Sequence, residues 1–344
     1  RPSYVLGGRA MEIVYDDMDL KKYLTEALEV DKKNPVLIDK FLDLAIEFDV
    51  EAISDGKSHI ICGVLQHIEQ AGVHSGDSAC SIPPYSIDKK LLSQIEATAI
   101  KVIKNMKISG LVNIQLAYAN SEIYLLEVNP RASRTIPFVS KAIGSPLAKI
   151  AAQIMSGKTL KALKITKFKK PKFYSVKEAV LPFEKFQAVD PILGPEMRST
   201  GEVMGIAPSF VEAFEKAEIA AGVSIPLEGS AFLSIRNTDK AYLGELAKSL
   251  TNSGFKLVAT RGTARDLETM GFKVEIINKV LEGRPHIVDL MKNKEISLVV
   301  NTTEGRESIT DSASIRRTAL DQKICCSTTI EGARAICKVI ENQV

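Results

Sequence analysis

Gln115, Glu127 and Asn129 are the side chains whose types and spacing best suit metal chemistry. Gln115 lies in a segment of strand composition, residues 111–118, and the other two lie in a second such segment, residues 123–129. The residues between these segments are turn-like, so a β-hairpin is predicted. Since alternate side chains of a strand share a face, Glu127 and Asn129 point the same way, about 7 Å apart along the strand.

The register of this hairpin decides which side chains meet. If the hairpin centres on Ser121, Gln115 lies directly opposite Glu127, and Asn113 lies opposite Asn129. One carboxylate and two or three amide groups would then share a patch. The other face of the hairpin is apolar, with Val112, Ile114, Leu116, Leu126 and Val128.

The chemistry that this patch predicts is the binding of cations and phosphates. Carboxylate and amide oxygens are ligands for Mg²⁺ or Mn²⁺, and Mg²⁺ usually takes its remaining ligands from phosphates and water. Arg131 and Arg134 follow the second strand, and guanidinium groups suit phosphate or carboxylate. The alternative is an ordinary solvated strand face that ends at Pro130. The convergence of these groups within residues 115–134 favours a metal–nucleotide site.

Composition and charge exclude several classes of protein. The 344 residues are 45% hydrophobic and 25% charged, which is ordinary for a globular protein with room for two domains. The net charge of +3 indicates no nucleic-acid partner, and a local basic run is typical of a solvated connection: Lys167, Lys169, Lys170 and Lys172. No apolar stretch of about eighteen residues occurs, so no membrane span is predicted.

The five cysteines indicate a reducing compartment. They show no CxxC spacing and no even framework, so a cytoplasmic location is expected and a zinc site is not. The chain starts at Arg1 without an initiator Met. We therefore expect it to be a piece of a longer protein, which leaves an upstream targeting segment open.

The segment before residue 222 is predicted to be a mixed α+β region. Residues 1–15 are typical of a strand, a glycine loop and a second strand, and residues 70–78 of a polar ligand loop, although a plain surface turn would use the same residues. The expected strands also include 36–41, 47–53, 60–69 and 175–183, and the expected helices are 19–27, 88–107, 137–156 and 210–221.

From residue 222 onward, strands and helices alternate with short loops. This pattern predicts a parallel sheet covered on both faces, the α/β class. The expected strands are 231–236, 255–260, 273–277, 297–301 and 324–327, and the expected helices are 239–252, 263–270, 286–292, 311–321 and 330–341.

Two threonine-rich loops follow strands of this second region. Their residues include Thr260, Gly262, Thr263, Asn301 and Thr303. Hydroxyls, a glycine and a helix N-terminus suit an anion, and ligands of open α/β sheets bind at the carboxyl ends of strands. Ordinary helix capping by threonine is the alternative, but Lys240 and Lys279 favour a phosphorylated ligand.

Five motifs occur in order along the chain: RPSYVLGGRAMEIVY at 1–15, GVHSGDS at 72–78, NIQLAY at 113–118, EVNPRASRT at 127–135 and KEAVLPF at 177–183. With the order of the elements, they closely resemble the C-terminal part of the large subunit of carbamoyl-phosphate synthetase. The resemblance implies that residues 1–221 are most of a second ATP-grasp unit that lacks its N-terminal part. Residues 222–344 would be an allosteric domain similar in fold to methylglyoxal synthase, a Rossmann-like α/β domain.

The resemblance also implies an active site. Gln115, Glu127 and Asn129 would hold two Mg²⁺ or Mn²⁺ ions, with K⁺ as a further candidate ion, and Arg131 and Arg134 would grip carbamate and the transferring phosphoryl group. ATP would contact Arg1, Asp39, Leu42, Glu47, Gly72, Val73, His74 and Ser75, as well as Gln115 and Glu127. The implied step is carbamate + ATP → carbamoyl phosphate + ADP.

Regulation is implied at two further sites. UMP or IMP would bind the C-terminal domain at Ser234, Lys240, Thr260, Thr263, Lys279, Asn301 and Thr303. Ornithine would bind at Glu69, Asp77, Glu178 and Thr328. The sequence departs from the family pattern at Cys326, where bacterial members have a tyrosine near the ornithine site, and at Lys40, where a histidine is common near adenine.

The family's partner would be a glutaminase small subunit that delivers ammonia. The overall synthesis would use glutamine or ammonia, bicarbonate and two ATP, and it would feed pyrimidine and arginine biosynthesis. An oligomer is expected, and this chain by itself is not expected to carry out the full synthesis.

Three alternatives remain at this stage. The chain could be an inert effector-binding and oligomerisation fragment, or part of another ATP-grasp enzyme such as a biotin-dependent carboxylase, which would not need the second domain. A lyase acting on triose phosphate is disfavoured because His286 is the only histidine after residue 222 and no Asp–His pair of that enzyme is visible.

Overall fold

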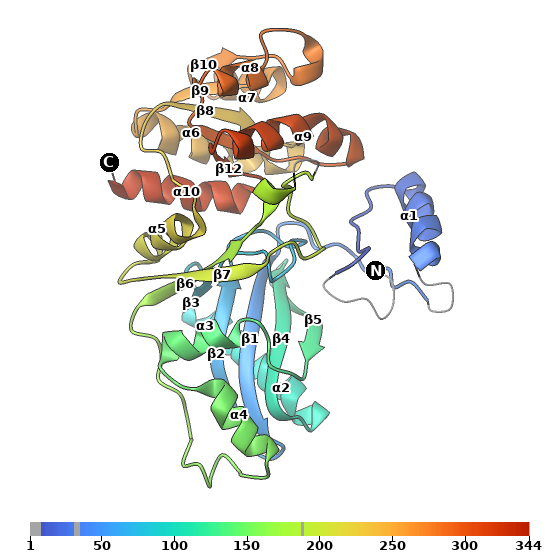
Figure 1. The fold of residues 1–344 in the computed structure, drawn as a ribbon, viewed down its shortest axis with the longest axis vertical. Coiled ribbons are helices and arrows are strands. Elements are labelled where there is room, and N and C mark those ends of the chain that lie inside the picture. Colours follow the sequence, from blue (N-terminus) through green and yellow to red (C-terminus); the bar gives the residue numbers. More distant parts are fainter. Residues whose placement is uncertain (1–7, 31–34, 187–188, 344) are drawn as a thin grey trace.

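The chain folds around an antiparallel and a parallel β-sheet, as the mixed α/β prediction requires (Figure 1). The computed structural model describes residues 8–30, 35–186 and 189–343. Among these residues, no helix is both long and apolar enough to cross a membrane.

The antiparallel sheet has seven strands in the order β5-β4-β1-β2-β3-β6-β7. Their bounds are β1 Ile46–Asp55, β2 His59–His67, β3 Cys80–Ile82, β4 Ser109–Ala119, β5 Glu122–Asn129, β6 Tyr174–Val180 and β7 Gly201–Ala207. The helices of this part are α1 Asp17–Val30, α2 Lys89–Met106, α3 Ile136–Ile143, α4 Leu147–Met155 and α5 Phe210–Ala221, with a 3₁₀ turn η1 at Phe183–Lys185.

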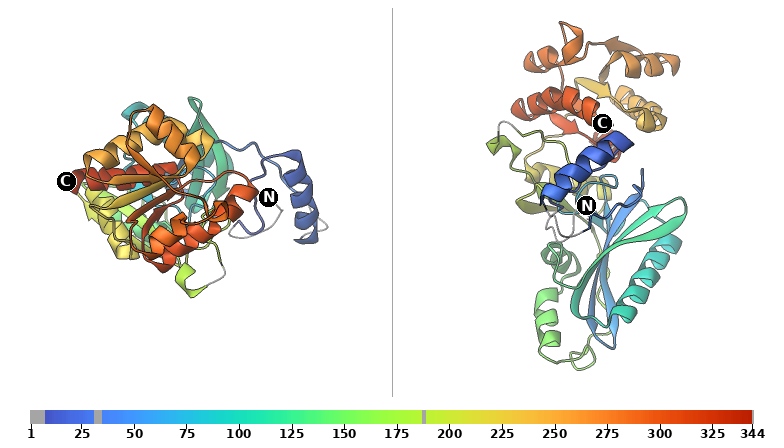
Figure 2. Two further views of the ribbon diagram at one scale, coloured as in Figure 1. Left: turned by 90° about the horizontal axis from the view of Figure 1, so that it is seen from above. Right: turned by 90° about the vertical axis from the view of Figure 1, so that its right-hand side faces the viewer.

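Alternation along β1 separates an apolar face from a polar one. Phe48 and Val50 pack under α2, which begins at its N-cap Asp88. Side chains at odd positions of β1 point to the opposite face, where α3 and α4 cover only the end near Ile53 (Figure 2). The rest of that face carries the acidic residues described below.

The parallel sheet has five strands in the order β10-β9-β8-β11-β12. Its elements are β8 Ser230–Ser234, η2 Asn237–Tyr242, α6 Leu243–Asn252, β9 Lys256–Ala259, α7 Arg261–Thr269, β10 Val274–Ile276, η3 Val280–Glu282, α8 Ile287–Lys292, β11 Leu298–Asn301, α9 Arg306–Asp321, β12 Cys325–Ser327 and α10 Ile330–Gln343. Helices α6, α7 and α10 bury one face of the sheet, and α8 and α9 bury the other. The predicted strands, helices and two-sided cover are therefore confirmed.

One core joins the two sheets. Helix α5 buries Phe214 between β6 and α10, and the same apolar cluster reaches Ala231 of β8 and Ile336 of α10. A buried ion pair adds a polar link, because Arg316 of α9 binds Asp190, which lies in the connection between β6 and β7. In Figure 1, α5 lies between the two sheets.

Three predicted elements differ from the structure. Residues 36–41 form no strand, and residues 8–15 form a turn followed by an irregular segment. No described strand pairs with either segment. Residues 1–7 of the predicted strand and glycine loop lie outside the described residues. The helical region 137–156 is two helices, since Gly144 ends α3 with a positive φ of 65° and Pro146 begins α4.

Candidate functional site

The predicted pairing of the hairpin is confirmed. Gln115 of β4 pairs with Glu127 of β5, and Asn113 pairs with Asn129. The route to this register differs from the prediction, because the turn is the two-residue pair Asn120–Ser121, with φ of 51° and 65°. A β-bulge in β5 then adds one residue and restores the expected pairing.

The bulge corrects the predicted orientation of Leu126. We predicted this side chain on the apolar face with Val128, but Leu126 packs against the cluster of Ala45, Ala71 and Ala117, as Leu42 does. The extra residue lets Leu126 turn to the face that carries Gln115 and Glu127. An apolar surface of suitable chemistry for a nucleobase therefore lies beside the polar patch.

Three carboxylates of β1 enlarge the patch. Glu47, Asp49 and Glu51 point to its face, with Asp49 paired to Gln115 and Glu51 paired to Asn113 in the backbone register. Asn113 Nδ2 donates to Asp49 Oδ1 and to Glu51 Oε1, each at 2.9 Å. Sequence reasoning named only Glu47, although the alternation of residues 46–53 was a usable signal.

His67 offsets part of this negative charge. Its Nε2 lies 3.0 Å from Asp49 Oδ2, and its Nδ1 lies 3.5 Å from Glu47 Oε2. Burial alone would raise the pKa of Asp49, but the hydrogen bond with His67 holds it below its ordinary value. Burial raises the pKa of Glu47 despite the histidine.

The predicted glycine loop contacts the hairpin. Ser75 Oγ accepts a hydrogen bond of 2.8 Å from Gln115 Nε2, and Glu47 accepts one from the backbone N–H of Gly72. Gly72 has a φ of +100°, and a Cβ there would lie 3.0 Å from the ring of Phe41, so glycine is required. Val73 is buried, and burial lowers the pKa of His74.

Lys177 fixes the far end of this loop. Its buried Nζ donates to the carbonyl oxygens of Ser75 at 3.2 Å and of Gly76 at 3.4 Å. Sequence reasoning gave this lysine no role. Its position between Val176 and Ala179 in a predicted strand was a usable signal, since a buried lysine needs partners.

Arg131 and Arg134 follow β5 on an exposed loop. Arg134 Nη1 contacts Met197 Sδ at 2.7 Å and lies 3.5 Å from Ser199 Oγ, so the β6–β7 connection holds it. Arg131 donates only to the neighbouring carbonyl of Ala132 among described residues. Arg134 Nε also lies 3.9 Å from Glu202 Oε1.

The other predicted nucleotide residues are distributed unevenly. Leu42 and Glu47 border the patch, as do Gly72 to Ser75. Asp39 is exposed on the irregular segment before β1, and Arg1 lies outside the described residues.

The donor chemistry fits a divalent cation. The amide nitrogens of Gln115 and Asn129 donate to Ser75 and Glu127, so their oxygens are the atoms left to face an ion. Within the described ranges, no group of three His, Cys, Asp or Glu side chains could hold a metal, so Glu127 and amide oxygens would share the ion with phosphates and water.

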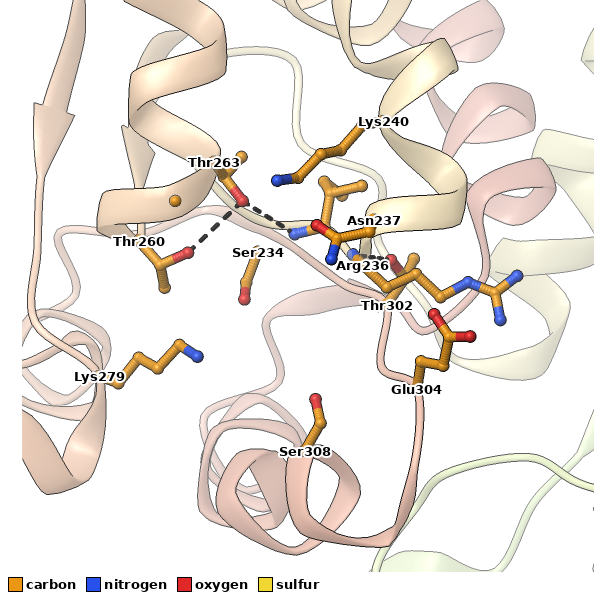
Figure 3. Close-up of a pocket in the computed structure, with 12 residues that line it drawn as sticks. Ser234, Arg236, Asn237, Lys240, Thr260, Thr263, Lys279, Thr302, Glu304 and Ser308 are labelled. Carbon is orange, nitrogen blue, oxygen red and sulfur yellow. Dashed lines mark hydrogen bonds between the residues drawn. The ribbon is translucent and has the colours of Figure 1, made fainter. Parts of the chain in front are cut away.

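A second candidate site is a pocket of about 370 Å³ at the carboxyl ends of the parallel strands (Figure 3). It opens where the chain leaves β8 and β11, neighbouring strands at which the strand order reverses. Five predicted effector residues line it: Ser234, Lys240, Thr260, Thr263 and Lys279. The first turn of α7 faces the pocket through Gly262, as the anion-site prediction requires.

Thr302 and Glu304 also line the pocket, and they belong to the second predicted loop, although neither was named as an effector residue. Arg236, Asn237 and Ser308 were not predicted. Thr302 Oγ1 accepts from the backbone N–H of Arg236 at 2.9 Å, which ties the two strand ends together. Lys240 is paired with Asp266 at 2.8 Å.

Two predicted effector residues do not line this pocket. Asn301 is buried, and its Oδ1 accepts from Arg316 Nη1 at 3.0 Å, while its Nδ2 has no described partner. Thr303 lies between the two lining residues Thr302 and Glu304 without lining the pocket itself.

The predicted ornithine residues are only partly together. Burial raises the pKa of Glu178, and the nearby carboxylates of Glu69 and of Glu218 on α5, which was not predicted, raise it further. Burial raises the pKa of Glu218 to about 8 and is also the main cause for Glu178. Asp77 instead accepts the backbone N–H groups of Arg198 and Ser199, at 2.7 and 2.8 Å, and Thr328 is half-buried beyond β12.

Two protein-family models match different parts of the chain. Residues 1–163 match the ATP-binding domain of the carbamoyl-phosphate synthase L chain, and residues 242–328 match the MGS-like domain. The chain is 57% identical over 341 residues to the carbamoyl phosphate synthase large chain of Pseudomonas putida and 54% identical over 344 residues to that of Halomonas eurihalina. Each match covers 99% of this chain and 32% of the relative, so the chain spans less than half the length of these relatives.

Among solved structures, the biotin carboxylase domain of the Hydrogenobacter thermophilus 2-oxoglutarate carboxylase, in complex with MgADP, ADP and bicarbonate, superposes with a TM-score of 0.51. It shares 15% sequence identity and covers 64% of this chain and 55% of its own. This similarity concerns the fold alone.

The antiparallel sheet with its hairpin and glycine loop thus defines an ATP-grasp ligase fold, joined to an MGS-like domain. With more than half of its residues identical over almost its whole length, the chain belongs to the family of carbamoyl phosphate synthase large chains.

Proposed function

We propose that the antiparallel part, residues 1–221, binds Mg²⁺–ATP and transfers the γ-phosphoryl group to carbamate. The observation that carries this proposal is the pairing of Gln115 with Glu127 beside Ser75 of the glycine loop. It joins the proposed cation-binding patch to the glycine loop, and Arg131 and Arg134 follow the same hairpin.

Different side chains would contact different parts of ATP and carbamate. The base would lie on the apolar surface of Leu42, Ala71 and Leu126, with the phosphates toward Gly72 and Ser75. Two bound Mg²⁺ or Mn²⁺ ions would neutralise the phosphates. Arg131 and Arg134 would orient carbamate, whose oxygen attacks the γ-phosphorus while the bond to ADP breaks; positioning and charge neutralisation suffice for such a transfer.

The negative charge of the patch makes the metal a requirement. Glu47, Asp49 and Glu127 lie on the face where a triphosphate would bind, and His67 and Lys177 offset only part of their charge. Divalent ions would convert a repulsive surface into an attractive one. K⁺ is a further candidate ion in the proposal.

The wider role follows from the family. The complete enzyme would make carbamoyl phosphate from glutamine or ammonia, bicarbonate and two ATP, glutamine-derived ammonia coming from a glutaminase small subunit. It would act in the cytoplasm for pyrimidine and arginine biosynthesis, as an oligomer.

The test uses the complete polypeptide, a full-length protein that contains this chain, and follows the phosphoryl transfer in the reverse direction. With ADP and carbamoyl phosphate, it should form ATP, and Glu127→Ala should lower the rate by about 100-fold or more. Glu122→Ala is the matched control, since Glu122 lies on the same strand and contacts only Tyr124 among described residues. Absence of ATP formation by the unaltered enzyme would overturn the proposal.

Residues 222–344 would be the regulatory domain. The pocket combines Lys240 and Lys279 with the N-terminus of α7, which suits the phosphate of UMP or IMP. Calorimetric titration should show saturable binding that Thr260→Ala weakens. Thr269→Ala, at the exposed end of the same helix, should bind normally. Binding that is insensitive to Thr260→Ala would place the effector elsewhere.

An amine effector such as ornithine is a second regulatory candidate. The observation that favours it is the cluster of Glu69, Glu178 and Glu218, in which Glu178 Oε2 is buried without a described partner. A cationic amine would relieve the repulsion among these carboxyls. Ornithine titration of Glu178→Gln should show weaker binding than the unaltered protein.

A further inference from the structure

Glu51 of β1 is buried completely on the patch face, and one of its oxygens collects three donors. Oε1 accepts from Asn113 Nδ2 at 2.9 Å, from Ser133 Oγ at 2.5 Å and from Thr135 Oγ1. Oε2 is buried without a partner among described residues. Burial raises the pKa of Glu51 to about 7, although the two hydroxyls act to lower it.

Two of these donors flank Arg134. Ser133 and Thr135 stand directly before and after it, and their hydroxyl oxygens lie 2.7 Å apart. The segment 130–135 forms no helix or strand, and both its arginines are exposed. The hydrogen bonds to Glu51 therefore tie an irregular loop to the central strands of the sheet.

Thr135 uses its hydroxyl in an unusual way for its position. It is the N-cap of α3, yet its side chain makes no capping hydrogen bond. A threonine at this position ordinarily accepts from the first turn of its helix. Here the hydroxyl donates to Glu51, so it positions the loop instead of stabilising the helix end.

The third donor connects the same carboxylate to the hairpin. Asn113 is paired with Asn129 in the sheet, and its Oδ1 lies 3.5 Å from Asn129 Nδ2. One buried group thus contacts both the arginine loop and the strand opposite the proposed metal ligands. The position of Glu51 therefore sets the spacing between the arginine loop and the hairpin.

We propose that Glu51 is a positioning residue that holds Arg131 and Arg134 at a fixed place relative to Gln115 and Glu127. The inference rests on the proposed phosphoryl transfer to carbamate. Misplacement of catalytic groups by about 1 Å can lower a rate about 100-fold while leaving binding intact. Loss of the anchor should therefore lower kcat and leave the KM for ADP nearly unchanged.

The test measures ATP formation from ADP and carbamoyl phosphate by the complete polypeptide. Glu51→Met, which keeps the length and removes the acceptor, should lower kcat about 10- to 100-fold with a KM for ADP within about twofold. Glu51→Gln keeps an acceptor oxygen for all three donors and should retain most of the rate. A role in stability alone would instead lower the yield of folded protein and leave the kcat per folded molecule unchanged.

A second pair of variants does not disturb the buried position. Ser133→Ala with Thr135→Val should reproduce the loss of kcat, and adding them to Glu51→Met should lower kcat little further because both remove the same contacts. Rates equal to the unaltered enzyme in Glu51→Met, or in the double variant, would overturn the inference. Absence of ATP formation by the unaltered enzyme would instead overturn the proposed function.

Discussion

The two halves of the molecule build ligand sites of opposite charge. On the antiparallel sheet, acidic side chains of β1 and β5 share one face, and the neighbouring glycine loop contacts this face through Gly72 and Ser75. On the parallel sheet, Lys240, Lys279 and threonine hydroxyls gather where strands end and helices begin. We therefore expect the first site to bind a polyphosphate only with cations and the second to bind a phosphate directly.

The difference follows from sheet geometry. Alternation along an antiparallel strand lets several side chains of one strand act on one face, as Glu47, Asp49 and Glu51 do. In a parallel sheet both faces are buried under helices, so only the strand ends remain for a ligand. A sheet face and a sheet edge therefore select different ligands within one chain.

Removal of divalent metal should cause the largest difference in nucleotide binding between the two sites. With a chelator in excess, binding of ATP to the complete polypeptide should weaken by more than about 100-fold, a change of about 3 kcal/mol. Binding of UMP or IMP to the pocket should not change, because Lys240 and Lys279 need no ion. Calorimetric titration of each nucleotide with and without metal measures both effects, and equal weakening at the two sites would refute the contrast.

Breaking the polar link between the halves should have the next largest effect. Arg316→Met leaves Asp190 and Asn301 without their buried partner, so we expect the free energy of unfolding to fall by about 3 kcal/mol. Arg198→Met removes an exposed pair with Glu196 and should change it by less than about 1 kcal/mol. Urea unfolding compares the two variants, and similar losses would mean that the buried pair contributes no more than a surface pair.

The buried carboxyls of the antiparallel half should make its stability depend on pH. Because the pKa of Glu218 is raised to about 8, the folded state binds an extra proton above about pH 4.5, and stability falls as the pH rises toward 8. Glu218→Gln removes this loss, so the variant should be more stable than the unaltered protein by about 3 kcal/mol near pH 7 and equal to it near pH 4.

Thermal unfolding at several pH values tests this expectation. Glu215→Gln serves as control, since Glu215 lies on the same helix but accepts only from Gln343 among described residues. If the difference in melting temperature between Glu218→Gln and the unaltered protein stays constant with pH, the titration of Glu218 does not cause the pH dependence of stability.

Local patterns predicted the elements and the pairings better than the irregular segments. Side-chain alternation predicted β4, β5 and the pairing of Gln115 with Glu127. The junction of strand and helix predicted Thr260 and Thr263 as residues of a ligand loop, and both line the pocket. Residues 36–41 have strand composition, but a strand needs a partner, which no local pattern supplies. The role of Arg316 was missed for a related reason, since its ion-pair partner Asp190 lies far away in the sequence.

The bulge shows most directly what the sequence leaves open. The predicted register assumed a turn centred on Ser121, whereas the structure reaches the same pairing by a tighter turn and one extra residue in β5. Both solutions place Glu127 opposite Gln115, but only the second turns Leu126 toward Leu42. Side-chain alternation alone cannot distinguish them, because the compensating residue is Leu126, inside the strand and away from the turn.

The smallest expected effect tests this turn. Asn120 and Ser121 both have positive φ, the conformation of a two-residue turn for which Asn-Gly is the preferred pair. Ser121→Gly should therefore raise the free energy of unfolding by about 0.5 kcal/mol. The same change at exposed Ser93, inside α2, should lower it by a similar amount, since glycine weakens a helix. Thermal unfolding of both variants measures the difference. Destabilisation by Ser121→Gly would indicate a turn with negative φ, and with it the wider hairpin in which Leu126 stays on the face of Val128.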